Sequence, residues 1–174
     1  MTPAVVGLDL SLTSTGFAVV TGIGRHAETI RRPQYKGTER LRSIRDAISE
    51  RVRGISPSLV VVEGYSFGSR ASQSHSLGEL GGVVRVELDA IGARWVALPP
   101  STLKKYATGK GNANKELMLT EAVRRLGYAG SSNDEADALW LACAGHHLLG
   151  TPVVDVPKVN AGALDGITLE AVAV

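Results

Sequence analysis

The order of apolar and polar positions along the 174 residues predicts strands first and helices afterwards. Residues 5–10 and 16–20 are short apolar runs separated by a Ser/Thr-rich turn, and a third short strand is expected at 27–31. Three strands in such quick succession indicate an antiparallel meander. Residues 59–62, Leu-Val-Val-Val, form a continuous apolar run that is typical of a strand buried on both faces.

Helical spacing of apolar residues follows in two long segments. Residues 38–53 and 76–91 each place their apolar side chains on one stripe, as an amphipathic helix does. The second segment contains Gly78, Gly81 and Gly82, and each glycine costs a helix roughly 1 kcal/mol relative to alanine. We therefore expect another backbone to approach that face closely. Shorter elements are predicted as a strand at 95–98 and helices at 115–126 and 133–149.

Strands followed by alternating helices and strands predict an α/β fold. Its central sheet should be mixed, with antiparallel first strands and with helices on both faces. We expect one domain over residues 1–150. Residues 151–174 have no clear period and contain several prolines and glycines, so they are expected to form a loosely packed or partly ordered C-terminal tail.

Composition restricts the class of protein further. No apolar run approaches the roughly 18 residues of a membrane span, and Met1–Ala4 has no basic segment, so we expect a cytoplasmic protein with no signal peptide and no membrane association. The single cysteine, Cys143, stands in an apolar stretch and is expected to pack in the core. A net charge of +2 does not by itself indicate a nucleic-acid partner.

Four acids stand where a core, or the edge of a core, is expected. Asp9 interrupts the first apolar strand, and Glu63 directly follows the strand at 59–62. For either acid alone, a salt-bridged residue at a strand end is the simpler interpretation. Asp134 and Asp137 are three residues apart and therefore share one face of the last helix, where acids also complement the helix dipole.

Taken together, the four acids predict a metal site. Two acids at the ends of adjacent strands and two from one helix face could converge on hard divalent cations, and Mg²⁺ prefers carboxylate oxygens. Two such ions roughly 4 Å apart can activate a water and stabilise the leaving oxygen in phosphodiester hydrolysis. Spacing in the sequence does not by itself establish that the acids converge.

The chain resembles the RuvC family of Holliday-junction resolvases, and the resemblance leaves a phage-type member open. It covers about residues 4–149 and follows the family's order of motifs. The first motif is an opening strand and turn with Asp9 (residues 7–17), and the second is a strand-end glutamate, Glu63 (61–64). They are followed by a glycine-bearing helix (77–84), a lysine-bearing segment (99–115) and a helix start with paired acids (134–139).

This resemblance implies a ribonuclease-H-like fold and a homodimeric endodeoxyribonuclease that acts in DNA recombination and repair. Each subunit would nick one strand of branched DNA such as a four-way junction, with Mg²⁺ or Mn²⁺, two ions per site, and no nucleotide cofactor. Asp9, Glu63, Asp134 and Asp137 would hold the metal, and Lys115 would stabilise the transition state. The implied DNA contacts are Lys104, Lys105, Lys110, Lys115, Arg70, Tyr65 and Phe67.

Two departures from the family pattern keep alternatives open. Leu10 and Ser11 follow Asp9 where the family often has Pro-Gly, and Ser66 stands where an aromatic wedge can lie. A relaxed branch or flap endonuclease on the same fold is therefore an alternative. A non-catalytic module that binds branched DNA would be expected to have lost at least one acid. An actin-like kinase, whose first phosphate loop is similar, needs two such domains. The glycine-bearing helix is the predicted dimer interface.

Overall fold

A five-stranded mixed sheet forms the centre of the computed structural model, which describes residues 3–64 and 71–169, with the backbone alone for 71–76. The strand order is β3-β2-β1-β4-β5. The strands β1 (Val5–Asp9), β2 (Thr15–Val20) and β3 (Arg25–Ile30) form the predicted antiparallel meander. The strands β4 (Leu59–Glu63) and β5 (Trp95–Leu98) extend the sheet in parallel with β1.

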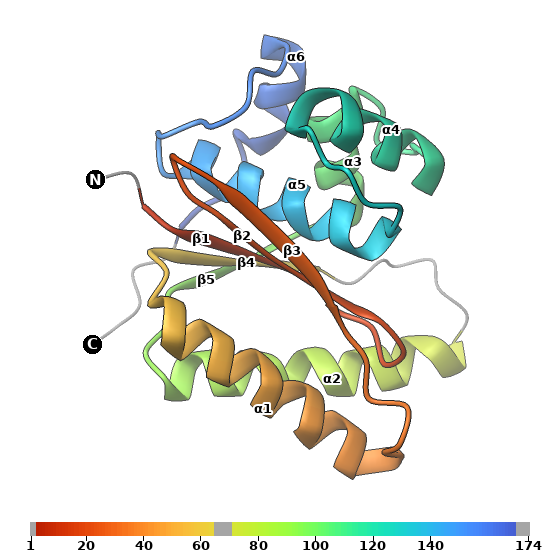
Figure 1. Ribbon diagram of the computed structural model, residues 1–174. Helices are drawn as coiled ribbons and strands as arrows, with labels where there is room; N and C mark the ends of the chain where they lie inside the picture. The colour runs from red at the N-terminus through yellow and green to blue at the C-terminus, as the bar shows by residue number, and fades with distance from the viewer. Residues whose placement is uncertain (1–2, 65–70, 170–174) are drawn as a thin grey trace.

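Helices cover both faces of this sheet, as predicted (Figure 1). On one face lie α1 (Gly37–Ile55) and α2 (Ala71–Ala90). Their apolar stripes meet the alternate side chains of the strands, among them Val6, Leu8 and Val60, in one core cluster. The α2 stripe is buried at Leu80, Val84 and Leu88, while its other side carries Val86, which is 69% exposed.

The opposite face carries α5 (Asn133–Leu148), with α3 (Pro100–Thr108) and α4 (Lys115–Leu126) packed outside it (Figure 1). Because α5 lies between the sheet and these helices, it is buried on nearly every side from Ala136 to His146. Cys143 is fully buried here, which confirms the expectation of a core cysteine.

Glycines bring α5 unusually close to the sheet. A side chain at Gly7 would collide with the backbone carbonyl of Ala138, and one at Gly16 would collide with the carbonyl of Asp134. From the helix side, a side chain at Gly145 would meet Val5 and Val61. Close backbone approach of this kind is a role that only glycine can fill.

The helix α3 was not predicted. Pro100 is the first residue of this helix. Proline suits that position because the first helical N–H has no partner within the helix. The helix is too short for its three buried side chains, Leu103, Tyr106 and Ala107, to give a clear periodic signal.

Residues 151–169 run along the outside of α3 and include the short helix α6 (Lys158–Ala161) and the 3-10 turn η1 (Gly162–Leu164). Leu164 and Asn160 are buried, and the Asn160 side-chain amide donates a hydrogen bond to the Tyr106 carbonyl. The division of the chain at residue 150 stays a prediction. Across the described residues, no helix has the length and apolar character that a membrane span requires.

Candidate active site

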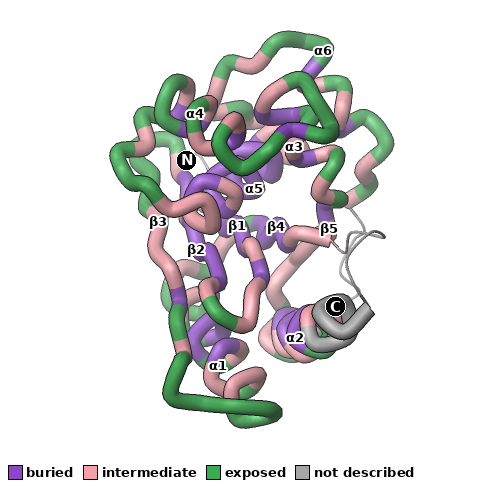
Figure 2. The backbone as a smooth tube through the Cα atoms, turned by 90° about the vertical axis from the view of Figure 1, so that its right-hand side faces the viewer, coloured by how far each residue is buried: buried purple, intermediate pink, exposed green. Residues whose placement is uncertain are grey.

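The sheet brings the strand-end acids to one edge. Since β1 and β4 are parallel and Leu8 pairs with Val62, the next residues along, Asp9 and Glu63, lie side by side at the carboxyl ends of their strands. Helix α5 begins at the same edge, because Gly16 at the start of β2 lies against the Asp134 carbonyl. Figure 2 looks toward this edge, with α3 and α4 above the sheet and α1 and α2 below it.

The start of α5 is fixed by a local capping interaction. The Ser132 hydroxyl is the N-cap and accepts a hydrogen bond from the backbone N–H of Glu135. The cap sets the first turn of α5. Asp134 and Asp137 therefore leave the helix on one face, toward Asp9 and Glu63.

Electrostatic interactions show that the four carboxylates converge. Burial raises the pKa of Asp9 well above its usual value, and the charges of Glu63, Asp137 and Asp134 raise it further. Burial likewise raises the pKa of Glu63, and a side-chain hydrogen bond with Asp9 partly offsets that rise. The pKa of Asp137 rises to about 7 because of burial and the charge of Glu63. Like charges are thus crowded into a partly buried site.

Such a cluster suits a cation of high charge. Asp137 Oδ1 is buried and accepts no hydrogen bond from the described residues. Carboxylate oxygens are the ligands that Mg²⁺ prefers, so the donor set fits this ion. Among the described residues, no three acidic, histidine or cysteine side chains are already arranged as ligands of one ion.

Two of the predicted lysines lie near the acids. Lys104 on α3 and Lys115, the first residue of α4, both lower the pKa of Glu63 and of Asp137 through their positive charge. The fold therefore brings Lys104 and Lys115 to the carboxylates, although they are far from them in sequence. Lys105 and Lys110 are exposed on the surface of the same α3–α4 region.

Three other predicted DNA contacts, Tyr65, Phe67 and Arg70, lie outside the described residues, as does Ser66. Their predicted roles stay predictions. They come after Gly64 in the chain, and the backbone N–H of Gly64 donates to the Leu98 carbonyl at the end of β5.

Two polar residues at the site were missed by the sequence interpretation. The Ser14 hydroxyl donates a 2.5 Å hydrogen bond to Asp134 Oδ2 from the turn between β1 and β2. Glu135, one residue after Asp134, is partly buried and accepts hydrogen bonds from Tyr128 (2.6 Å) and Thr29 (2.8 Å). The Ser/Thr-rich turn next to Asp9 was a signal for Ser14, but the partner of Glu135 depends on tertiary contacts.

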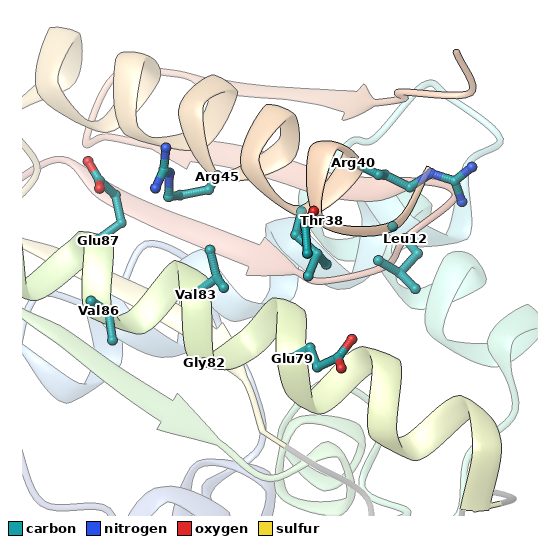
Figure 3. Close-up of a pocket in the computed structure, with 11 residues that line it drawn as sticks. Leu12, Thr38, Arg40, Arg45, Glu79, Gly82, Val83, Val86 and Glu87 are labelled. Atoms are coloured by element: carbon teal, nitrogen blue, oxygen red, sulfur yellow. The ribbon is translucent and has the colours of Figure 1, made fainter. Parts of the chain in front are cut away.

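A groove of about 900 Å³ lies away from the acids, between α1 and α2 (Figure 3). Its walls are Leu41 and Arg45 on α1 and Val83 and Glu87 on α2, and Leu12 of the β1–β2 turn closes one end. None of the four predicted metal ligands lines this groove. The carboxylate edge is therefore the better candidate for an active site.

Acids from two adjacent strand ends and one helix start, on a mixed sheet, define a ribonuclease-H-like nuclease. The chain belongs to the RuvC family: the family model described as "Crossover junction endodeoxyribonuclease RuvC" matches residues 5–146. This family is generally metal-dependent. The matched range contains all four acids as well as Lys104 and Lys115.

Individual relatives agree with this assignment. RuvC of Treponema denticola is 30% identical over 128 residues, which cover 70% of this chain and 71% of the relative. RuvC of Synechococcus sp. (strain WH7803) is 29% identical over 152 residues, covering 81% and 96%. The comparisons do not indicate a phage-type member.

Solved structures agree on the fold. The structure of Thermus thermophilus RuvC superposes with a TM-score of 0.70 at 27% identity, covering 87% of this chain and 99% of that one. The same protein in complex with a Holliday junction substrate gives 0.70 at 26% identity, covering 88% and 99%. The yeast mitochondrial resolvase Ydc2 shares the fold at a TM-score of 0.57 and 11% identity, with 92% and 80% covered. The predicted ribonuclease-H-like fold is confirmed.

Proposed function

We propose that this chain is a structure-selective endonuclease that resolves four-way DNA junctions by paired nicks through metal-dependent hydrolysis of phosphodiester bonds. The observation that carries the proposal is the convergence of four carboxylates at one sheet edge in a chain of the RuvC family. The Thermus thermophilus relative has been solved with a Holliday junction substrate, which supports the choice of DNA substrate. A cytoplasmic location is part of the proposal.

Asp9, Glu63, Asp134 and Asp137 would hold Mg²⁺ or Mn²⁺, two ions per site. Bound there, these ions would supply an activated water and would stabilise the leaving oxygen of a phosphodiester. The chain contributes rigid positions for the ligands, since Asp9 and Glu63 end paired strands and both aspartates stand in the first turns of a buried helix. Cation binding would also relieve the repulsion that raises the pKa of Asp9 and Asp137.

Lys115 and Lys104 would act on the substrate. Their positive charges interact with Glu63 and Asp137, so they would also interact with a phosphodiester bound over these acids. Lys115 is the candidate for stabilising negative charge on the phosphate in the transition state, and Lys104 for fixing the phosphate. Lys105 and Lys110 are candidates for backbone contacts outside the scissile phosphate. Arg70, Tyr65 and Phe67 are candidates for contacts with the junction centre.

Asp9→Asn tests the catalytic assignment. With Mn²⁺ and a four-way junction, the variant is expected to lose cleavage while retaining junction binding, because asparagine keeps the shape of the side chain without its charge. In EDTA its Tm should match or exceed that of the wild type, since asparagine resembles the protonated form that burial favours at Asp9. Mn²⁺ should raise the Tm of Asp9→Asn by less than it raises the Tm of the wild type.

The matched control is Asp155→Asn, which changes an exposed aspartate in the segment after α5. It is expected to cut at the wild-type rate. Undiminished cleavage by Asp9→Asn, in a preparation free of other nucleases, would exclude the proposed mechanism.

A relaxed branch or flap endonuclease is the second candidate, and Ser66 in place of an aromatic wedge favours it. Cleavage rates on four-way, three-way and flap substrates at equal concentration distinguish the two. Symmetric paired cuts in four-way junctions at a much higher rate support the resolvase. Comparable rates on all three substrates would assign the relaxed activity instead.

Paired nicks require two active sites, and we propose a homodimer formed through α2. Among the described residues, and apart from the helix's own backbone, no atom lies within 4 Å of a side-chain carbon placed at Gly82, so this glycine leaves open space on the helix. Exposed Val86 lies one turn further along. Gly82→Leu should weaken self-association in analytical ultracentrifugation. Val123→Leu, at an exposed valine on α4, should not. Equal dimer affinity in all three proteins would contradict an α2 interface.

A further inference from the structure

Ser14 makes a direct contact with one of the candidate metal ligands. Its hydroxyl donates to Asp134 Oδ2 at 2.5 Å, across 120 residues of sequence. A short hydrogen bond to an ionised acceptor is among the stronger ones in proteins. Asp134 therefore has one oxygen held by the β1–β2 turn.

The turn that presents Ser14 is itself fixed. The Thr15 hydroxyl, fully buried, donates to the Ser11 carbonyl at 2.6 Å and accepts from the Ser11 backbone N–H at 3.1 Å. The Ser11 hydroxyl in turn accepts from the backbone N–H groups of Thr13 and Ser14. These bonds close the turn on itself and hold the Ser14 backbone in one conformation.

Gly16 completes the arrangement from the strand side. It lies against the carbonyl of Asp134, where any side chain would collide with that oxygen. The backbone of Asp134 is thus set by Gly16 and its carboxylate by Ser14, two residues apart in the same strand start. Both contacts come from the segment that also carries Asp9.

We propose that Ser14 is a positioning residue for Asp134 and that it sets the affinity of the site for its divalent cation. The inference rests on the proposed function, because it takes Asp134 as a metal ligand. With Oδ2 engaged by the hydroxyl, the other oxygen of Asp134 is left for the cation, and the carboxylate loses little rotational freedom on binding. Hydrogen bonds to a ligating carboxylate typically change metal affinity by about 10- to 100-fold.

Direct Mn²⁺ titration by calorimetry tests this, with the full chain as wild type, Ser14→Ala, Ser14→Thr and Thr13→Ala. Ser14→Ala should bind Mn²⁺ about 10-fold more weakly, and Ser14→Thr, which keeps the hydroxyl, should restore most of the affinity. Thr13→Ala removes an exposed hydroxyl from the same turn and should bind as the wild type does. In an Asp134→Asn background, Ser14→Ala should change the affinity much less.

Other readouts separate a positioning role from a merely structural one. In EDTA, Ser14→Ala should melt close to the wild type, because the rest of the turn network is intact. In junction cleavage, it should need about 10-fold more Mn²⁺ for half-maximal rate and approach the wild-type rate at saturating metal.

Wild-type Mn²⁺ affinity in Ser14→Ala, or an equal loss in Thr13→Ala, overturns the inference. So does a lowered Tm in EDTA with unchanged affinity. If the wild type binds Mn²⁺ and Ser14→Ala weakens that binding while no junction is cut, the proposed function fails and the role of Ser14 stands. A wild type that binds no Mn²⁺ overturns the role of Ser14 by itself.

Discussion

The two faces of the sheet are packed in different ways. On the α5 face, glycines at Gly7 and Gly16 let a helix backbone touch the strands, and Gly145 does the same from the helix. On the α1–α2 face, large branched side chains such as Ile44, Ile48 and Leu88 fill the space instead. The first arrangement fixes the helix closely, and the second leaves room for a groove of about 900 Å³ between its helices.

The difference matters because the acids of the site come from the close-packed side. Catalytic groups must be held to within a fraction of an ångström of their working geometry, and rigid elements hold them better than loops do. A helix in backbone contact with the sheet cannot slide without a clash, so Asp134 and Asp137 stay in register with Asp9 and Glu63. The other face has no such requirement, and α2 keeps an exposed apolar residue, Val86, that is available for assembly.

The largest expected effect comes from filling the close contact. Gly7→Ala would place its methyl group against the backbone of Ala138 and Ala142, neither of which can yield locally. We expect a loss of about 3 kcal/mol or more in the free energy of unfolding, at the upper end for overpacking. Gly54→Ala, at an open helical position on the other face, should be neutral or stabilise by roughly 0.5–1 kcal/mol. Urea denaturation measures both; similar values would remove the contrast between the faces.

A middle-sized effect is expected at the polar clamp, the group in which Tyr128 and Thr29 both donate to the Glu135 carboxylate of α5. Tyr128, whose pKa is raised to about 12 by burial and its bond to Glu135, remains a donor throughout the neutral range. Among the described residues, Tyr128→Phe leaves the Glu135 carboxylate with Thr29 as its remaining side-chain donor. We expect a cost of about 1–2 kcal/mol and a severalfold slower cleavage as the start of α5 loosens. Tyr35→Phe, at an exposed tyrosine, should change neither the free energy of unfolding nor the cleavage rate. A similar loss in Tyr35→Phe would show that the effect of Tyr128→Phe is not due to the clamp.

The smallest effect concerns an ion pair on the other face. Arg51 of α1 binds both oxygens of Glu28 on β3, at 2.8 and 3.1 Å, and lies 5.9 Å from the centre of the Phe17 ring. The hydrogen bond from Arg51 lowers the pKa of Glu28, so its stabilisation is present above the usual glutamate value and is lost as the pH falls through the lowered one.

Arg51→Met should therefore cost about 0.5–1 kcal/mol at pH 7, as partly exposed pairs do. The difference from the wild type should shrink as the pH falls below the ordinary glutamate pKa of about 4.3 and through the lowered pKa of Glu28. Arg45→Met, which breaks a pair with the adjacent Asp46 within α1, should cost less. Thermal melts across pH measure both. A difference that is constant with pH would attribute the effect of Arg51 to packing on Phe17.

Much of the fold could be predicted because the pattern of apolar residues is regular where elements are long. The meander, the buried strand β4 and the helices α1, α4 and α5 match their predicted segments to within two residues, whereas α2 begins at Ala71, five residues before its predicted start. The helix α3 could not be recognised, since Pro100 marks its start and only one of its faces is apolar over nine residues. The packing of residues 151–169 against α3 had no periodic signal at all.

The sequence by itself determined which residues could do the chemistry: Asp9 and Glu63 at strand ends, and Asp134 and Asp137 one turn apart on a helix. Only the tertiary structure decided that they meet, because convergence depends on the parallel pairing of β1 with β4 and on the depth at which α5 sits. That depth is set by Gly7 and Gly16, whose missing side chains leave no periodic signal in the sequence. The hydrogen bond from Ser14 to Asp134 was likewise decided by the tertiary structure, because the two residues are 120 positions apart in the sequence.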